Sequence, residues 1–150
     1  MEKPDITSAN ISDRQEMIDI RNRHNSDPNK HWCISHPFED EDVSTEDGNV
    51  YFVARLQNTM VGYMWMNSED SFCREHKGAE IFLVVDKGFR KKEVGSELRD
   101  HAVRHATEET RFRSLFAKVK AANIGANALF KGWKKKDGNN GAFYSLEIGI

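Results

Sequence analysis

Long apolar runs and cysteines are scarce in this sequence. No apolar stretch approaches the roughly 20 residues that a membrane-spanning helix needs, and the opening MEKPDITSANIS lacks the apolar core of a signal peptide. The two cysteines, Cys33 and Cys73, could form at most one bridge, which excludes a scaffold built on several disulfides. We therefore expect a cytoplasmic protein with two reduced thiols and no membrane partner.

An excess of positive charge is also missing. The 22 basic and 24 acidic residues give a formal net charge of −2, so the chain has no overall basic field of the kind that binds nucleic acid nonspecifically. Nucleic acid is accordingly disfavoured as a partner. The chain has 150 residues, with no internal repeat and no low-complexity linker, which predicts one domain over residues 1–150.

Strand and helix signals alternate along the chain. β-rich or alternating segments predict strands, and these lie at 5–9, 50–56, 60–66, 79–85, 114–120 and 142–150. Apolar residues at helical spacing predict helices, and these lie at 11–25, 95–109 and 122–133. An acidic stretch with six carboxylates at 39–47 is a loop or a solvated helix surface. This order predicts an α/β fold with helices packed on a mixed sheet.

Residues 89–98, FRKKEVGSEL, join a buried strand to a helix. A helix N-terminus has unpaired N–H groups and a partial positive charge, so it attracts phosphate. Gly95 would let the main chain approach an anion closely, and Arg90 could bind one bidentately. A basic turn of this kind is also compatible with a solvated surface.

Three stretches together resemble the GNAT N-acetyltransferase family. VARLQNTMVGYMW resembles the family's central hairpin, AEIFLVVDKGFRKKEVGSEL its cofactor strand and R-x-x-G-x-G loop, and NIGANALF its N-x-x-A-x-x-L-Y helix. The three occur in the family's order and spacing from Val50 to Ile150, whereas residues 1–49 fit only in their layout. The resemblance implies a GNAT-like α+β fold, in which helices flank a mixed, mostly antiparallel central sheet.

The resemblance also implies a function, the transfer of an acetyl group from acetyl-CoA to a primary amine of a small molecule or a protein. Glu80 stands where many family members carry the catalytic base, although a glutamate at a strand edge facing solvent is equally compatible with the sequence. The positions that would contact the cofactor are Leu83, Val85, Arg90, Lys91, Lys92, Glu93, Val94, Gly95, Ser96, Asn123 and Phe130. No metal is expected, because the spacings of His31, Cys33, His36, Cys73 and His76 match no recurrent zinc site.

Several positions depart from the family pattern, among them Lys91, which replaces the glycine common after the arginine, and the segment KGWKKKDGNNG, which replaces a glycine-aromatic pair. Glu93 replaces the first glycine of the loop, which would cost about 1–2 kcal/mol if the backbone there were left-handed. We expect its side chain to point to solvent. Phe130 stands where the family often has a tyrosine that protonates the departing thiolate, and phenylalanine cannot donate a proton. These departures leave a second hypothesis open, a non-catalytic GNAT-like module that binds CoA or a protein partner.

The remaining features bear on partners. The acidic stretch at 39–47 could attract a cationic amine acceptor, or could simply be solvated. Lys131 and residues 134–136 form a basic cluster around Trp133, for which a solvated face is favoured over a contact with CoA phosphate or nucleic acid. His101 and His105 are predicted to be surface residues. The apolar terminal strand could pair across a homodimer, and a monomer is equally compatible.

Overall fold

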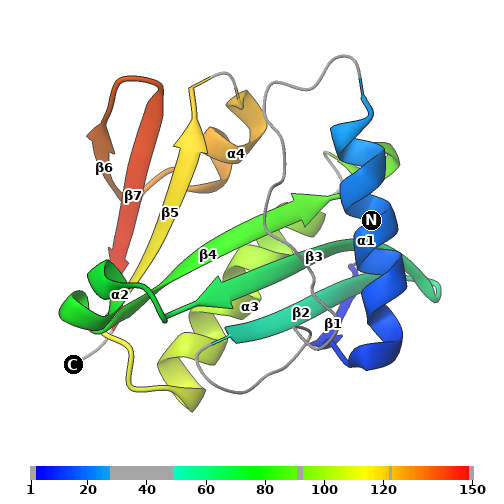
Figure 1. Cartoon of the computed structure of the whole chain (residues 1–150), viewed down its shortest axis with the longest axis horizontal. Coiled ribbons are helices and arrows are strands. Elements are labelled where there is room, and N and C mark those ends of the chain that lie inside the picture. Colours follow the sequence, from blue (N-terminus) through cyan, green and yellow to red (C-terminus); the bar gives the residue numbers. More distant parts are fainter. Residues whose placement is uncertain (1–2, 28–48, 91–92, 122, 149–150) are drawn as a thin grey trace.

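The computed structural model describes residues 3–27, 49–90, 93–121 and 123–148. Figure 1 shows one twisted sheet with helices on both of its faces. The strands are β1 (Asp5–Ser8), β2 (Asn49–Leu56), β3 (Thr59–Asn67), β4 (Gly78–Val85), β5 (Ser114–Lys120), β6 (Lys134–Asp137) and β7 (Gly141–Glu147). The helices are α1 (Arg14–Asn25), α2 (Ser71–His76), α3 (Val94–Glu109) and α4 (Ile124–Leu129), with short 3-10 turns η1 (Ile11–Asp13) and η2 (Lys87–Phe89).

The seven strands form a single sheet in the order β1-β2-β3-β4-β5-β7-β6. Every neighbouring pair is antiparallel except β4 and β5, which are parallel. Helices α1 and α2 pack on one face, and α3 and α4 pack on the other. The predicted mixed, mostly antiparallel sheet flanked by helices is therefore confirmed.

The central hairpin shows how closely local sequence determines this part of the fold. Gln57 and Asn58 join β2 to β3, and both have positive φ, at 49° and 70°. Two consecutive left-handed residues are typical of the tight turn whose twist suits a hairpin. The predicted hairpin is thus confirmed.

Two elements were not predicted from the sequence. Helix α2 has only six residues, and it forms because Asp70 accepts a hydrogen bond from the Cys73 amide at its start and Lys77 adopts a left-handed conformation at its end. Strand β6 contains three lysines and an aspartate, a composition that is typical of a solvated segment. It lies at the edge of the sheet, where charged side chains are well tolerated. The last predicted helix is correspondingly shorter than expected and ends at Leu129.

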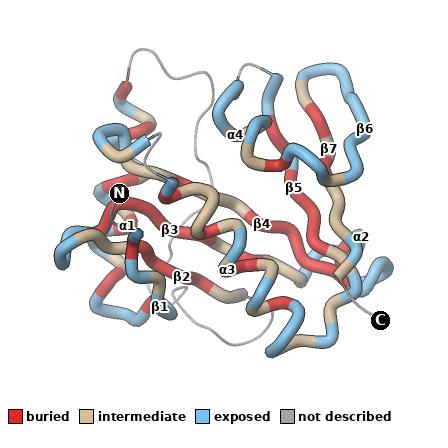
Figure 2. The backbone as a smooth tube through the Cα atoms, turned by 180° about the vertical axis from the view of Figure 1, so that it is seen from behind, coloured by how far each residue is buried: buried red, intermediate tan, exposed pale blue. Residues whose placement is uncertain are grey.

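Each face of the sheet buries its own apolar cluster, and Figure 2 shows that the buried segments follow the central strands and one side of α3. The α1 side contains Met17, Ile20 and Tyr63. The α3 side contains Leu98 and other residues of α3 against β2, β3, β4, β5 and β7. No helix within the described ranges is long and apolar enough to cross a membrane.

Candidate functional site

The parallel strands β4 and β5 separate shortly after they begin. Their register contains three pairs, Gly78 with Ser114, Ala79 with Leu115 and Glu80 with Phe116. Beyond Glu80, β4 continues to Val85 and β5 to Lys120, and Figure 1 shows the two strands diverging. The pairing of β4 with β5 therefore ends at Glu80, and we call the place where the two strands part the opening, with Glu80 at its vertex.

Main-chain groups of β4 point into this opening. The Asp86 amide donates to the Val61 carbonyl at 2.8 Å, in register with the pairs between β3 and β4. Hydrogen-bonded and non-hydrogen-bonded pairs alternate along an antiparallel ladder, so the N–H and C=O groups of Leu83 and Val85 point away from β3. These two residues were predicted to pair with the cofactor, and their main chain is oriented for an extended ligand between the strands.

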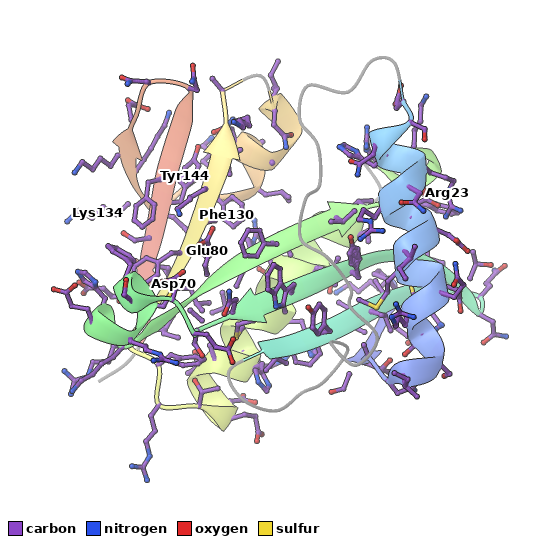
Figure 3. The ribbon with its side chains drawn as sticks, in the orientation of Figure 1. Arg23, Asp70, Glu80, Phe130, Lys134 and Tyr144 are labelled. Carbon is purple, nitrogen blue, oxygen red and sulfur yellow. The ribbon has the colours of Figure 1, made fainter. Side chains whose placement is uncertain are left out.

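Glu80 is buried, with 7% of its surface exposed. It lies on the α2 face of the sheet, and Figure 3 shows it with Asp70 where β4, β5 and α2 meet. Its Oε1 lies 3.7 Å from the Nζ atom of Lys118 on β5. Burial raises the pKa of the Glu80 carboxyl, Lys118 opposes that rise, and the Asp70 carboxylate adds to it. The alternative of a solvent-facing glutamate is therefore wrong.

The start of α2 supplies two further groups beside Glu80. The Asp70 carboxylate accepts the Cys73 amide at 2.8 Å, which is the main cause of its lowered pKa. The Cys73 thiol is buried, and burial together with Asp70 raises its pKa to about 12. Cys73 is thus a neutral apolar neighbour of Glu80, and its thiol is poorly suited to act as a nucleophile at neutral pH.

The N-terminus of α3 faces the predicted phosphate loop. Glu93 caps the helix with a left-handed backbone, at φ 65° and ψ 5°, and its side chain is exposed as predicted. The Ser96 hydroxyl donates to the Glu93 carbonyl at 3.0 Å, while the amides of Val94 and Gly95 belong to the free first turn of the helix. The structure thus has the backbone shape that a glycine at position 93 would adopt without strain. Lys91 and Lys92 lie outside the described residues.

Arg90 contacts α1. Its Nη2 lies 3.1 Å from Nδ1 of His24, a buried residue near the end of α1. Asp86 is bound bidentately by Arg23 at 3.2 and 2.9 Å, and Lys87 lies 3.3 Å from Asp27. The segment that follows β4 is therefore fastened to α1, and an anion at the loop would compete with His24 for Arg90.

Gly95 has a packing role in addition to the one predicted. A Cβ atom built there would lie 3.0 Å from Cδ1 of Leu129, so the missing side chain lets α4 approach the start of α3. Arg99 of α3 also donates a hydrogen bond to the Leu129 carbonyl. The two helices that border the opening on this face are thus held together.

Asn123 and Asn127 organise α4. The Asn123 side chain accepts the Ala126 amide at 3.0 Å and so caps the helix. Asn127 donates to the carbonyls of Lys120 and Asn123 and accepts the hydroxyl of Tyr144 at 2.6 Å. Asn123 therefore orders the helix beside the opening, and its contact with cofactor stays a prediction.

Phe130 is part of the core. It is 3% exposed, and its ring packs against Trp133 and Tyr144 at centroid distances of 4.9 and 5.4 Å. Phe130 thus contributes packing beside α4, as Figure 3 shows with Tyr144 nearby. Its predicted contact with cofactor is untested.

Several residues around the site were not assigned to it from the sequence. Asp70, Phe72 and Cys73 come from the unpredicted helix α2, and Lys118 was placed on a strand without a role. The one available signal was alternation in β5, which puts Lys118 on the same face as Phe116. Within the described part of the chain, no group of three His, Cys, Asp or Glu residues is arranged to hold a metal ion. The acidic stretch at 39–47 and the candidate ligands His31, Cys33 and His36 lie outside it.

Comparison with known proteins gives a consistent picture. The family model described as the acetyltransferase (GNAT) family matches residues 16–133. A ribosomal-protein-alanine N-acetyltransferase from Brucella melitensis superposes with a TM-score of 0.78 at 19% identity, covering 95% of this chain and 99% of that one. An N-acetyltransferase from Staphylococcus aureus Mu50 gives 0.76 at 18%, covering 98% and 99%.

A third structure contains a ligand. A GNAT superfamily phosphinothricin acetyltransferase from Sinorhizobium meliloti, in complex with AcCoA, superposes with a TM-score of 0.76 at 18% identity, covering 99% of this chain and 90% of that one. No curated protein matches the chain. At these identities the solved structures establish the fold.

Proposed function

Because the chain belongs to the acetyltransferase (GNAT) family, we propose that it transfers the acetyl group of acetyl-CoA to a primary amine. The observation that carries this proposal is the position of Glu80, a buried carboxyl at the vertex where β4 and β5 separate. A base with a raised pKa placed in an opening of the sheet suits the deprotonation of an amine near neutral pH.

We place acetyl-CoA at the opening, on the α3–α4 face of the sheet. The main chain of Leu83 and Val85 would pair with the amide-bearing arm of the cofactor, and the free amides of Val94 and Gly95 would bind its pyrophosphate. We assign to the same anion the charged side chains of Arg90, Lys91 and Lys92 and the main-chain amides from Lys91 to Ser96. Asn123 and Phe130 would border the arm from the α4 side. When bound, acetyl-CoA supplies the activated acetyl group.

The chain's residues would act on the amine. Glu80 takes a proton from the acceptor ammonium, directly or through water, and leaves the nitrogen lone pair free. That nitrogen forms a bond to the acetyl carbon while the carbon–sulfur bond breaks, and the electron pair leaves with sulfur. A main-chain amide of β4 would stabilise the carbonyl oxygen. Phe130 cannot protonate the departing thiolate, so we assign that proton to water, which also takes the second proton that the nitrogen loses as the amide forms.

Turnover measurements test the proposal. Release of free thiol from acetyl-CoA would be followed with a panel of primary amines, for the wild-type protein and for Glu80→Gln. We expect Glu80→Gln to lower kcat at least 100-fold with unchanged affinity for acetyl-CoA. Glu75→Gln is the matched control, because Glu75 is an exposed carboxylate on α2, and it should keep the wild-type rate.

Calorimetric titration separates this function from the second hypothesis, a module that binds CoA or a partner without turnover. Acetyl-CoA would be titrated into the wild-type protein and into Glu93→Gly. Micromolar binding by both would show a functional loop. Binding by the glycine variant alone would show that the carboxylate disables the loop. Binding without thiol release for any amine would favour the non-catalytic module.

A further inference from the structure

An open groove of about 670 Å³ lies on the α2 face of the sheet, over β5, β7 and the turn between β6 and β7. We call it the Phe72–Phe143 groove, after two aromatic residues that line it. Their ring centroids lie 5.6 Å apart in an edge-to-face arrangement. Phe72 is 42% exposed, so α2 presents an uncovered apolar surface to the groove.

Three lysines line the same groove. Lys118 on β5 and Lys136 on β6 are both in register with Phe143 on β7. Residues directly opposite one another on neighbouring strands project from the same face, so the Phe143 side chain lies between two lysine side chains. Lys120, two residues after Lys118 on β5 and opposite Gly141, also lines the groove. The acidic residue of the groove is Asp137, which is paired with Lys135 at 3.4 Å.

Lys118 connects the groove to Glu80. Lys118 lines the groove, and its Nζ lies 3.7 Å from Oε1 of Glu80. Phe116, the register partner of Glu80, stacks on Phe143 at 5.5 Å. A ligand whose amine reaches Glu80 would therefore extend over the aromatic rings and beside the lysines.

We infer that the acceptor is a primary amine that also carries a carboxylate and an apolar side chain, as in an apolar α-amino acid. This inference rests on the proposed acetyl transfer. The ammonium of such an acceptor would face Glu80, its carboxylate would replace Glu80 as the partner of Lys118, and its side chain would cover Phe72 and Phe143. The neighbouring carboxylate and ammonium of Glu80 and Lys118 are complementary to a zwitterion of this size.

A polyamine fits this surface poorly. Its second ammonium would lie among Lys118, Lys120 and Lys136, where like charges repel. The expectation of a cationic acceptor drew on the acidic stretch at 39–47, which lies outside the described residues. The described groove selects for the opposite charge.

Two ligands that differ only in the carboxylate test the inference. L-phenylalanine and L-phenylalaninol share the amine and the ring, and the alcohol lacks the negative charge. Amide chemical shifts of Gly141 and Phe143 would be followed while each ligand is added to the full chain, and thiol release would be measured in parallel with acetyl-CoA. We expect L-phenylalanine to shift both amides and to exceed L-phenylalaninol in kcat/KM by about tenfold.

Two lysine substitutions supply a matched pair. Lys136→Gln removes a charge from the groove, and we expect it to reduce the preference for L-phenylalanine over L-phenylalaninol about threefold to tenfold. Lys131→Gln removes the same charge from an exposed residue that does not line the groove, and it should leave the preference unchanged. The ratio of kcat/KM for L-phenylalanine to kcat/KM for L-phenylalaninol cancels any effect of the substitutions on the base.

The outcomes separate the inference from the proposed function. If L-phenylalaninol is acetylated as well as L-phenylalanine, the inference is overturned and the acetyl transfer stands. If L-phenylalanine shifts Gly141 and Phe143 and no amine is acetylated, the ligand class holds and the acetyl transfer fails. If millimolar L-phenylalanine moves neither amide, the inference is overturned whatever the turnover.

Discussion

Glu80 and Lys118 form an ion pair across the two parallel strands, with Oε1 and Nζ 3.7 Å apart where β4 and β5 begin to diverge. The two partners differ in exposure, since 9% of the Glu80 side chain and 68% of the Lys118 side chain are accessible. Solvent therefore screens the pair, and burial outweighs it in setting the pKa of Glu80.

Removal of the lysine charge should move the pH profile of the reaction. Lys118 lowers the pKa of Glu80, so Lys118→Gln is expected to raise it further. Because the base must be ionised, the acidic limb of kcat/KM should shift to higher pH, by a fraction of a unit given the exposure of Lys118. Lys135→Gln serves as the control with equal charge. An unchanged acidic limb in Lys118→Gln would show that Glu80 is not the titrating base.

Relief of backbone strain at position 93 should stabilise the protein. Glu93 has a φ of 65°, a conformation that costs a non-glycine residue about 1–2 kcal/mol. Part of the gain is lost to the greater freedom of glycine in the unfolded chain, so Glu93→Gly should raise the free energy of unfolding by about 1 kcal/mol. The urea midpoint measures the change. Glu93→Ala keeps the strain, and an equal gain in that variant would refute the explanation.

Sequence patterns predicted the parts of the fold in which local chemistry agrees with the tertiary structure. The β2–β3 hairpin has a two-residue turn with positive φ at both positions, and α3 has a regular apolar stripe. The vertex of the opening could be placed only through family resemblance, because the separation of β4 from β5 follows from long-range packing.

The acceptor side was harder to predict for a physical reason. α2 is shorter than two turns, so no periodic pattern can reveal it, and its capping by Asp70 becomes visible only in the folded chain. The lysines of β6 have the sequence pattern of a solvated segment. A strand is recognised by apolar and polar residues that alternate, and in β6 every side chain is charged. Which of these lysines lies beside Phe143 depends on the strand pairing between β6 and β7.

Close packing at Gly62 predicts a large effect of one methyl group. A Cβ atom there would lie 2.7 Å from the Val84 carbonyl oxygen and 3.2 Å from a side-chain carbon of Val94. Because a backbone atom cannot move aside cheaply, Gly62→Ala should lower the free energy of unfolding by about 1–3 kcal/mol. Nothing lies within 4 Å of the same position at Gly88, so Gly88→Ala should stay within about 0.5 kcal/mol of wild type. Equal urea midpoints for the two variants would contradict this account of the contact between α3 and the sheet.

His101 and His105 were predicted to be surface residues, and the structure shows them only partly exposed. Both are partly buried on α3 and pack edge-on against Phe52, with ring centroids at 4.5 and 5.0 Å. Burial lowers the pKa of each imidazole below 6.5, Arg104 adds to the effect at His101, and Glu109 opposes it at His105. The folded state therefore favours the neutral rings.

This shift makes stability depend on pH with a definite sign. Above the unfolded pKa of about 6.5 both states hold neutral histidines, and the full contribution is present. As pH falls from there toward the lower folded pKa, the unfolded chain binds protons first, so the free energy of unfolding declines. Replacement of both residues by glutamine should flatten the decline between about pH 7 and 5 in urea titrations, whereas substitution of the exposed His76 should preserve it. The difference between wild type and the double variant isolates the histidines from Glu80, whose raised pKa acts in the opposite direction. An equally steep decline in the double variant would assign the acid sensitivity to other groups.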